Sequence, residues 1–298
     1  MSTDNSKKRT PLLIGFIFAS SMFTVFVATR DKKDVEQTIQ PADDTELNST
    51  DGGEATRDSS IAEVLEIANA SLENMAQSLH DYTATFVKQD CDKSGTLNEP
   101  SKMQVKIQTR MRNETNDAPK RIYLKFLAPE ATAGREVIWG ADLYDGNLQV
   151  HDTSILLSWK TLSLPPEGML AMQGQRFPIY EIGLVRLVEQ LIERGTADAN
   201  NPDVSVTITR GHMVDDLETE LIRVKRPKPS EREDDFSLAE VIYDPERLLI
   251  ISYRSFGWPE NGSDELPLLE SYEYQDLKTN VGLTDSDFDV ENESYAYP

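Results

Sequence analysis

Side chains that commonly carry out catalysis are few in this sequence of 298 residues. The three histidines, His80, His151 and His212, lie far apart, and no two have the spacing of a helical zinc-binding motif. The Gly-x-Ser-x-Gly turn that exposes a nucleophilic serine is absent. The glycines of residues 168–174 match neither a phosphate-binding loop nor a dinucleotide fingerprint. The sequence therefore predicts a protein that is not an enzyme and that has no metal site and no cofactor.

Alternating aspartates near the end of the chain resemble the start of a calcium-binding loop. Asp285, Asp287 and Asp289 have the spacing of its first three ligands. Such a loop needs glycine at its sixth position and glutamate at its twelfth, but these positions hold Val290 and Ala296. We therefore interpret this segment as a solvated acidic tail.

Cysteine content and charge exclude several further classes. The single cysteine, Cys91, rules out an internal disulfide and a zinc site built from several cysteines. It stands in the polar turn QDCDKSG, which predicts an exposed thiol. The chain has 30 Lys and Arg residues against 52 Asp and Glu residues, a net charge of −22. A nucleic-acid partner is excluded because so acidic a protein repels a phosphate backbone.

Two arginines in the middle of the chain are candidates for ligand binding. Arg176 stands in the loop before a predicted helix, and it can pair with Glu181 to fix that helix against a sheet. This structural role is the more common one for such a pair. The alternative is that Arg135 and Arg176 mark the polar mouth of an apolar cavity and meet a carboxylate or phosphate head group.

Large apolar side chains accompany these arginines. Met169 and Met172 lie in a loop, where core packing does not explain them, and thioethers suit a surface that adapts to varied apolar ligands. Trp139 falls near the predicted contact between helix and sheet, where it is either core or part of the cavity. The candidate ligand-binding residues are therefore Arg135, Arg176, Met169, Met172 and Trp139.

The helix that follows the loop 165–183 is the best helix of the chain after residue 80. Its apolar residues recur at helical spacing. Glu181 is placed in its first turn, Arg194 in its last turn, and Gly195 is predicted to end it. The residues of its apolar stripe are Leu184, Val185, Leu187, Val188, Leu191 and Ile192.

A second helix is predicted from Ser59 or Ser60 to about His80, and most of the remaining chain has strand patterns. Residues 102–112 alternate strictly between apolar and polar side chains, as in a half-covered antiparallel sheet. Short turns join successive strands, which favours antiparallel neighbours. We expect an α+β fold, a curved antiparallel sheet or half-barrel covered by one or two helices. A split into two small α+β domains near residue 196 is the alternative. The predicted strands are 81–90, 102–112, 121–127, 135–140, a partner after Asp145-Gly146, 155–162, 204–209, 217–225, 236–243, 247–256 and 268–283.

The first part of the chain differs from the rest in composition. Residues 11–28 carry no charge and are about long enough to cross a bilayer, which favours a transmembrane anchor over a cleaved signal peptide. Acids, Ser, Thr and Gly dominate the next segment, and aromatic residues are absent, as in a disordered linker. The predicted organisation is a basic tail at 1–10, an anchor or signal segment at 11–28, a disordered acidic linker at 29–58, a folded domain at 59–290 and a tail at 291–298.

Three stretches of the sequence resemble the bacterial family DUF1571, which is common in planctomycetes. They are DYTATFVKQD at 81–90, RIYLKFLAPEATAGREVIWG at 121–140 and LAMQGQRFPIYEIGLVRLVEQLIER at 170–194. The resemblance covers roughly residues 75–290, and the family has no established activity, so it supplies no catalytic residues. The family is similar in layout to the LolA/LolB lipoprotein carriers, in which helices cover an apolar cavity in a half-barrel.

These observations lead to two hypotheses of function. In the first, the chain is an exported, membrane-tethered, non-enzymatic domain that binds a lipid, acyl chain or other amphipathic ligand in an apolar half-barrel cavity. In the alternative, the core is closed and the chain is a structural or protein-interaction module of the cell envelope. Both place the chain in the cell membrane through residues 11–28, with the domain on the exported, periplasmic side. The partners implied are the membrane, a lipid or lipoprotein, and an envelope protein.

Overall fold

The computed structural model describes residues 40–42, 55–92, 94–155, 157–230, 232, 235–259 and 264–298. They belong to one compact unit, Ile39–Pro298. The predicted anchor at 11–28 lies outside the described residues, as do the basic tail and most of the predicted linker. Within the described part, no helix is both long enough and apolar enough to cross a membrane.

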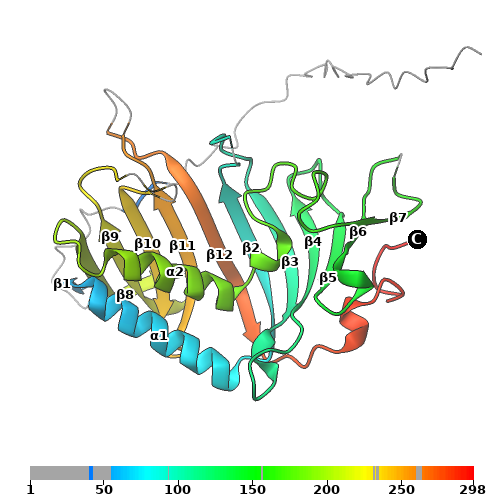
Figure 1. Ribbon diagram of the computed structural model, residues 1–298, viewed down its shortest axis with the longest axis horizontal. Helices are drawn as coiled ribbons and strands as arrows, with labels where there is room; N and C mark the ends of the chain where they lie inside the picture. The colour runs from blue at the N-terminus through cyan, green and yellow to red at the C-terminus, as the bar shows by residue number, and fades with distance from the viewer. Residues whose placement is uncertain are drawn as a thin grey trace, which may run out of the picture. The chain divides into compact units, whose positions relative to one another are not determined.

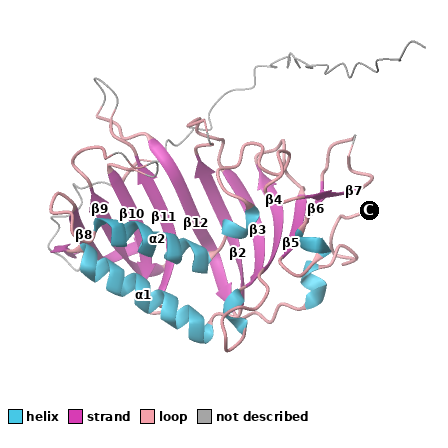
Figure 2. Ribbon diagram, in the orientation of Figure 1, coloured by secondary structure: helices cyan, strands magenta, loops and turns pink. Residues whose placement is uncertain are grey.

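The described residues form one curved sheet of 12 antiparallel strands (Figures 1 and 2). Its order is β1-β8-β9-β10-β11-β12-β2-β3-β4-β5-β6-β7. Because β12 pairs with both β11 and β2, the last strand joins the two halves of the chain, and a split near residue 196 does not occur. The strands are β1 (Ala55–Ser59), β2 (Asp81–Asp90), β3 (Ser101–Gln108), β4 (Arg121–Ala128), β5 (Glu136–Gly140), β6 (Leu148–His151), β7 (Thr161–Leu164), β8 (Ser205–Val214), β9 (Leu217–Lys225), β10 (Leu238–Asp244), β11 (Leu249–Phe256) and β12 (Leu268–Thr279).

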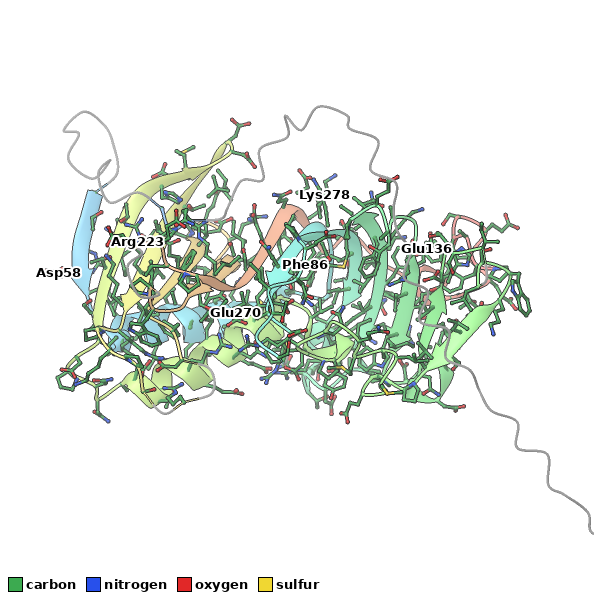
Figure 3. All side chains as sticks on the ribbon, turned by 90° about the horizontal axis from the view of Figure 1, so that it is seen from above. Asp58, Phe86, Glu136, Arg223, Glu270 and Lys278 are labelled. Carbon is green, nitrogen blue, oxygen red and sulfur yellow. The ribbon has the colours of Figure 1, made fainter. Side chains whose placement is uncertain are left out.

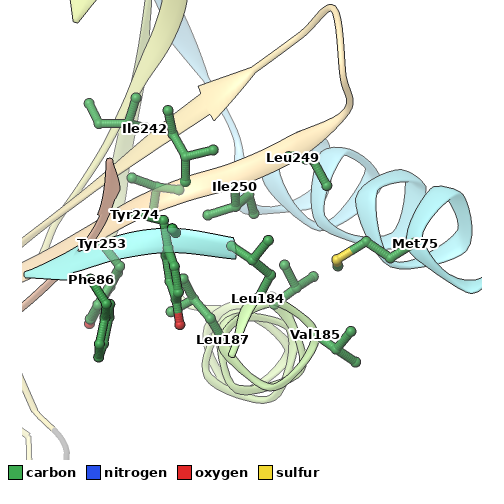
Figure 4. Close-up of a cluster of buried hydrophobic side chains, with 14 of the residues drawn as sticks. Met75, Phe86, Leu184, Val185, Leu187, Ile242, Leu249, Ile250, Tyr253 and Tyr274 are labelled. Carbon is green, nitrogen blue, oxygen red and sulfur yellow. The ribbon is translucent and has the colours of Figure 1, made fainter. Parts of the chain in front are cut away.

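Two α-helices cover one face of this sheet, so the predicted curved antiparallel sheet with covering helices is confirmed (Figure 1). Helix α1 (Ile61–Ser78) begins where the Ser60 side chain accepts a hydrogen bond from the Glu63 amide, and it packs against α2 (Leu184–Asp198) and β11. The first two turns of α2 bury four residues of the predicted apolar stripe, Leu184, Val185, Leu187 and Val188 (Figure 4), whereas Leu191 and Ile192 are half-buried. Short 3-10 turns occur at Arg110–Arg112, Tyr144–Gly146, Ile179–Glu181 and Asp285–Phe288.

Helix α2 differs from its predicted bounds at both ends. Glu181 lies in a 3-10 turn before the helix, because Gly183 occupies the N-cap position. Gly195 does not end the helix, which continues to Asp198. A Cβ at Gly195 would stand 3.0 Å from a methyl group of Leu65 in α1. This glycine therefore lets the two helices approach closely and is not a C-cap.

Two strands differ from the prediction because strand pairing decides where they begin. Residues 155–162 were expected as a strand, but β7 begins only at Thr161, where pairing with β6 starts. Residues 55–58 were expected in the linker, but they pair with β8 as β1 and complete the opposite edge of the sheet. Local composition does not reveal either pairing, because each depends on a neighbouring strand.

The C-terminal segment packs on the face of β4 and β5 opposite the helices. Tyr123 and Ile138 alternate with core residues along these strands, so they point to this opposite face. They pack with the fully buried Phe288, and Tyr295 stacks on Tyr123 with ring centroids 4.2 Å apart. Glu136, at the right of Figure 3, accepts a hydrogen bond of 2.9 Å from the Ala296 amide. The expectation of a solvated tail was therefore wrong.

Charged groups are buried at the other end of the same face. Glu240 of β10 stands in register between Arg223 of β9 and Arg254 of β11. The distances from its two carboxylate oxygens to these guanidinium groups are 2.9 and 2.6 Å. The Ala42 amide also donates to Glu240, at 3.1 Å, so residues 40–42 lie against this cluster. Figure 3 labels Arg223 here, far along the sheet from Glu136.

Candidate functional site

A cavity of about 550 Å³ lies between the helix-covered face of the sheet and the connection 165–183, which joins β7 to α2. Its walls are mainly aliphatic and aromatic, and the polar or charged residues that also line it are Lys88, Asp90, Arg135, Asp152, Gln173, Gln175, Glu181 and Gln190. This size and lining are typical of a site for a small apolar ligand. The sheet contributes Phe86, Leu124, Phe126, Val137, Leu148, Val150, Leu162, Leu164, Tyr272 and Tyr274, and the connection contributes Pro166, Leu170, Ala171, Phe177, Ile179 and Ile182.

Aromatic rings from two paired strands form part of the cavity wall. Phe86 of β2 stacks on Tyr274 of β12, with ring centroids 4.7 Å apart, and on Tyr272 at 6.2 Å. The Tyr272 hydroxyl lies 3.2 Å from Glu270 Oε2 and 3.3 Å from Asp90 Oδ2. Burial raises the pKa of Tyr272, so its hydroxyl stays protonated and donates to these carboxylates.

Two ion pairs stand at the margins of the cavity. Arg135 contacts Asp152 at 2.7 Å, and Lys88 contacts Asp90 at 3.2 Å. Although burial alone would raise the pKa of Asp152, hydrogen bonds from Ser154 and Arg135 hold it below its ordinary value. Both cations in the lining are therefore paired with carboxylates within the protein.

The entry to α2 is fixed by a lysine from another part of the chain. Gly183 has φ of +127°, and a Cβ there would stand 3.0 Å from the Tyr82 hydroxyl. That hydroxyl accepts a hydrogen bond of 2.9 Å from the Leu184 amide. It thereby does what the side chain of an N-cap residue usually does, which glycine cannot do. Lys120 Nζ donates to the carbonyl of Tyr180, at 2.8 Å, and to that of Ile182. These contacts hold the connection 165–183 over the cavity.

The free energy of unfolding of the domain should depend on pH through Lys120. Burial lowers the pKa of its ammonium group to about 8, although Glu181 and Glu189 act to raise it. In the unfolded chain a lysine titrates near pH 10.4, so the unfolded state binds more protons between these values. Stability should therefore rise with pH from 8 to about 9.5, at up to about 1.4 kcal/mol per pH unit.

Urea unfolding at several pH values, compared with the Lys120→Met variant, measures this effect. The wild-type protein should gain stability from pH 8 to about 9.5, below the usual tyrosine titration. The variant should lack this component. Equal pH slopes in the two proteins would show that Lys120 remains fully charged in the fold.

The two candidate arginines have different surroundings. Arg135 lines the cavity, in its pair with Asp152. Arg176 lies in an adjacent groove that shares Phe177 and Gln190 with the cavity, and its guanidinium carbon stands 5.4 Å from the centre of the Phe177 ring. Within the described part of the chain, Arg176 makes no ion pair or hydrogen bond.

The expected pair between Arg176 and Glu181 does not form. The Glu181 carboxylate instead accepts hydrogen bonds from Arg186, at 2.5 Å, and from Gln190, at 3.0 Å. Both donors lie on α2, and they reach back to the carboxylate from the first two turns of the helix. Arg176 is thus left as a cation beside the cavity without a carboxylate of its own among the described residues.

The other three candidates do not line the cavity. Trp139 is buried in the core, and its indole N–H donates to the Gly146 carbonyl at 3.1 Å. Met169 is exposed and Met172 is half-buried, while Leu170 and Ala171 between them face the cavity. The sequence analysis missed the aromatic wall, although the period of two in strands 81–90 and 268–279 places its rings on one face.

The thiol and one of the three histidines are buried in the fold. Cys91 is buried, contrary to the prediction of an exposed thiol, because its backbone bridges to Leu97 and its side chain lies beside the Leu268 carbonyl. His151 is buried near Tyr297 of the C-terminal segment. In the described ranges, no three His, Cys, Asp or Glu side chains are grouped so that they could hold a metal ion.

Comparisons with known proteins identify a family for most of the chain. The family described as "Protein of unknown function (DUF1571)" matches residues 79–297, so the match reaches into the packed C-terminal segment. Among curated proteins there is no match.

Several solved structures are similar to this chain over most of their length. A DUF1329 family protein from Desulfovibrio piger has 10% identity and a TM-score of 0.36, over 77% of this chain and 97% of its own. A putative outer membrane lipoprotein-sorting protein domain from Vibrio parahaemolyticus has 11% identity and a TM-score of 0.34, over 77% and 97%. A LolA superfamily protein from Nitrosomonas europaea has 11% identity and a TM-score of 0.29, over 74% and 97%.

Proposed function

Because the chain belongs to the DUF1571 family, whose function is unknown, the cavity is the main guide to activity, and we propose that the domain binds an acyl chain of a lipid or a similar amphipathic molecule. The observation that carries this proposal is the apolar cavity of about 550 Å³ under the connection 165–183. Burial of each ligand methylene there contributes about 0.8 kcal/mol. The proposal assigns no catalytic step to the protein.

The cavity favours this function over a closed structural module. In a closed module the inner side chains of the sheet would fill the space under the helices, as in an ordinary core. Here the helices cover one half of the face of the sheet. The connection 165–183 covers the other half and leaves the cavity beneath it. A binding protein needs such space, whereas a purely structural module has no use for it.

We place the head group of the ligand at Arg176. Arg135 and Lys88 are already paired with carboxylates, whereas Arg176 has no ion pair or hydrogen bond within the described part of the chain. A guanidinium group beside an apolar cavity suits a carboxylate or phosphate, which it binds through two parallel hydrogen bonds. The acyl chain then lies in the cavity, and the charged end lies in the groove.

Residues 11–28 would hold this binding domain at a membrane, with the domain on the exported side. This part of the proposal rests on the uncharged sequence of that segment alone. Extraction of membranes at alkaline pH tests it, because a spanning segment resists such treatment.

Native mass spectrometry with lipid extraction, on protein purified from cells, tests the binding function directly. A co-purifying acyl lipid of defined mass supports the proposal. The proposal is contradicted if the protein has the mass of the chain alone and this mass does not change when fatty acids or phospholipids are added. That result favours the closed envelope module.

The Arg176→Glu variant tests the head-group position. It should bind a long-chain fatty acid at least tenfold more weakly, because a hydrogen bond to a charged group contributes about 1.5–3 kcal/mol. The matched long-chain alcohol should bind both proteins equally, since it has no carboxylate. Displacement of a fluorescent fatty acid measures both affinities.

The Arg210→Glu variant is the control for a general charge effect, because Arg210 is exposed on β8. It should leave fatty-acid binding unchanged. If Arg210→Glu weakens binding as much as Arg176→Glu does, or if the alcohol is affected equally, the head group does not lie at Arg176.

A further inference from the structure

Two loops beside the cavity expose unusually large apolar side chains. Ile155 and Trp159, in the connection between β6 and β7, are 94% and 69% exposed. Met169 and Leu170, in the connection 165–183, are 87% and 65% exposed. Scattered apolar side chains are normal on a protein surface, but here four of them stand on two loops that belong to one site.

Both loops also form the wall of the cavity. Leu157 of the first loop and Leu170 of the second line it, as do Leu162 and Leu164 of the intervening β7. The exposed residues therefore lie on the same two loops that line the cavity.

This surface differs in charge from the rest of the protein. Residues 153–176 contain two bases, Lys160 and Arg176, and one acid, Glu167, a sum of 2 − 1 = +1 in a chain of net charge −22. The Glu167 carboxylate also accepts a hydrogen bond from the Tyr180 hydroxyl at 2.5 Å. With Glu167 as their one acid, the loops lack the excess of negative charge that the rest of the chain carries.

The residue types match the interface of a bilayer. Tryptophan is enriched at the boundary between lipid chains and water, and lysine extends its ammonium group toward phosphates. Here Lys160 Nζ stands 5.3 Å from the centre of the Trp159 ring, so the two groups are neighbours. Separate side chains on turns are suited to insertion among lipids, whereas a protein partner usually packs on a contiguous apolar patch.

We propose that the loops 153–160 and 165–176 dock the domain on the surface of a zwitterionic lipid bilayer, with the cavity opening toward the lipids. Ile155, Trp159 and Met169 enter the boundary between head groups and chains. A ligand with an acyl chain then moves between bilayer and cavity without crossing water. The docking surface does not depend on which molecule the cavity holds.

The test uses the full chain with Cys91→Ala, so that a polarity-sensitive fluorophore can be attached to a single introduced cysteine. The labelled variants are Ile155→Cys and Met169→Cys. The matched control is Met213→Cys, because Met213 is also apolar and 53% exposed but lies at the end of β8. Each protein is mixed with phosphatidylcholine vesicles, with or without a doxyl-labelled phospholipid that quenches the fluorophore.

Fluorophores at positions 155 and 169 should shift their emission to shorter wavelength and lose at least half of it to the doxyl lipid. The control at position 213 should do neither. Vesicles rich in phosphatidylglycerol should bind more weakly, because the chain as a whole is acidic. If Cys91→Ala does not fold, brominated lipids replace the label: they should quench the tryptophan emission of the unmodified protein, and Trp159→Phe should remove most of that quenching.

Three results would overturn the proposal. In the first, vesicles leave the emission at positions 155 and 169 unchanged. In the second, all three positions are quenched equally, which shows that another part of the chain brings the whole domain into contact with lipid. In the third, the shift appears without vesicles and grows with protein concentration, which identifies a second copy of the chain as the partner of this surface.

Discussion

Replacing Ala171 with tryptophan should remove acyl ligand from the protein while leaving the fold intact. Ala171 lies in the connection 165–183 and lines the cavity from the side opposite the sheet. An indole ring at this position takes up space that the ligand would occupy. Because the substitution is on a loop and its side chain enters an existing cavity, it avoids the strain of overpacking a filled core.

The measured quantities are the amount of co-purified lipid and the affinity for a long-chain fatty acid. We expect binding to weaken at least tenfold, which corresponds to about 1.4 kcal/mol or more. The control is Ala131→Trp, which places the same indole on an exposed turn between β4 and β5. It should bind ligand like the wild type and show the same midpoint of thermal unfolding.

The chemical nature of the ligand separates this result from the head-group prediction. Ala171→Trp should weaken the binding of a fatty acid and of its matched alcohol equally, since both need the space in the cavity. Arg176→Glu should weaken the binding of the fatty acid only. If Ala171→Trp binds lipid normally, the cavity is not the acyl site, whatever Arg176 does.

Periodicity in the sequence predicted most of the sheet, because strand patterns record which face is buried. The stretch 81–90 coincides with β2. The predicted strand 102–112 is correct only in part, because β3 ends at Gln108 and Arg110–Arg112 form a 3-10 turn. The apolar stripe of α2 was likewise visible, since Leu184, Val185, Leu187 and Val188 recur at helical spacing and are buried. These features are local, and a period of 2 or 3.6 residues is sufficient to identify them.

Other features depended on neighbours that a single segment does not reveal. Gly195 resembles a helix end, but α2 continues through it to Asp198, and its missing Cβ makes room for Leu65 of α1. The cavity itself is a property of the fold, since a loop and not a third helix covers the second half of the sheet. Of the predicted site residues, Arg135 and Arg176 come to the cavity and its neighbouring groove, whereas Trp139 is part of the core.

The prediction of a solvated tail for the C-terminal segment was wrong because it relied on the acidic composition of the segment. Its aspartates pair with bases on the sheet: Asp287 contacts Lys106 at 2.7 Å, and Asp285 contacts Arg121 at 2.5 Å. Phe288, Tyr295 and Tyr297 then supply the apolar contacts between these charges. Aromatic residues spaced among the acids distinguish this segment from a solvated tail, which has few of them.

Replacing Phe288 with alanine should therefore destabilise the whole domain by about 3–5 kcal/mol. Phe288 is fully buried against Tyr123 and Ile138, and its removal leaves a cavity between the sheet and the C-terminal segment. Urea unfolding followed by circular dichroism measures the change in the free energy of unfolding. The control is Val281→Ala, seven positions earlier and 44% exposed, which should stay within about 0.5 kcal/mol of the wild type.

Ligand binding distinguishes this effect from those at the cavity. Phe288 packs on the face of the sheet opposite the cavity, so the folded fraction of Phe288→Ala should bind fatty acid with wild-type affinity. A change in stability below about 1 kcal/mol would mean that the segment adds little to the fold. A loss of affinity in the folded protein would mean instead that the packing of β4 and β5 on this face sets the shape of the cavity on the other, through Leu124 and Val137 of the same strands.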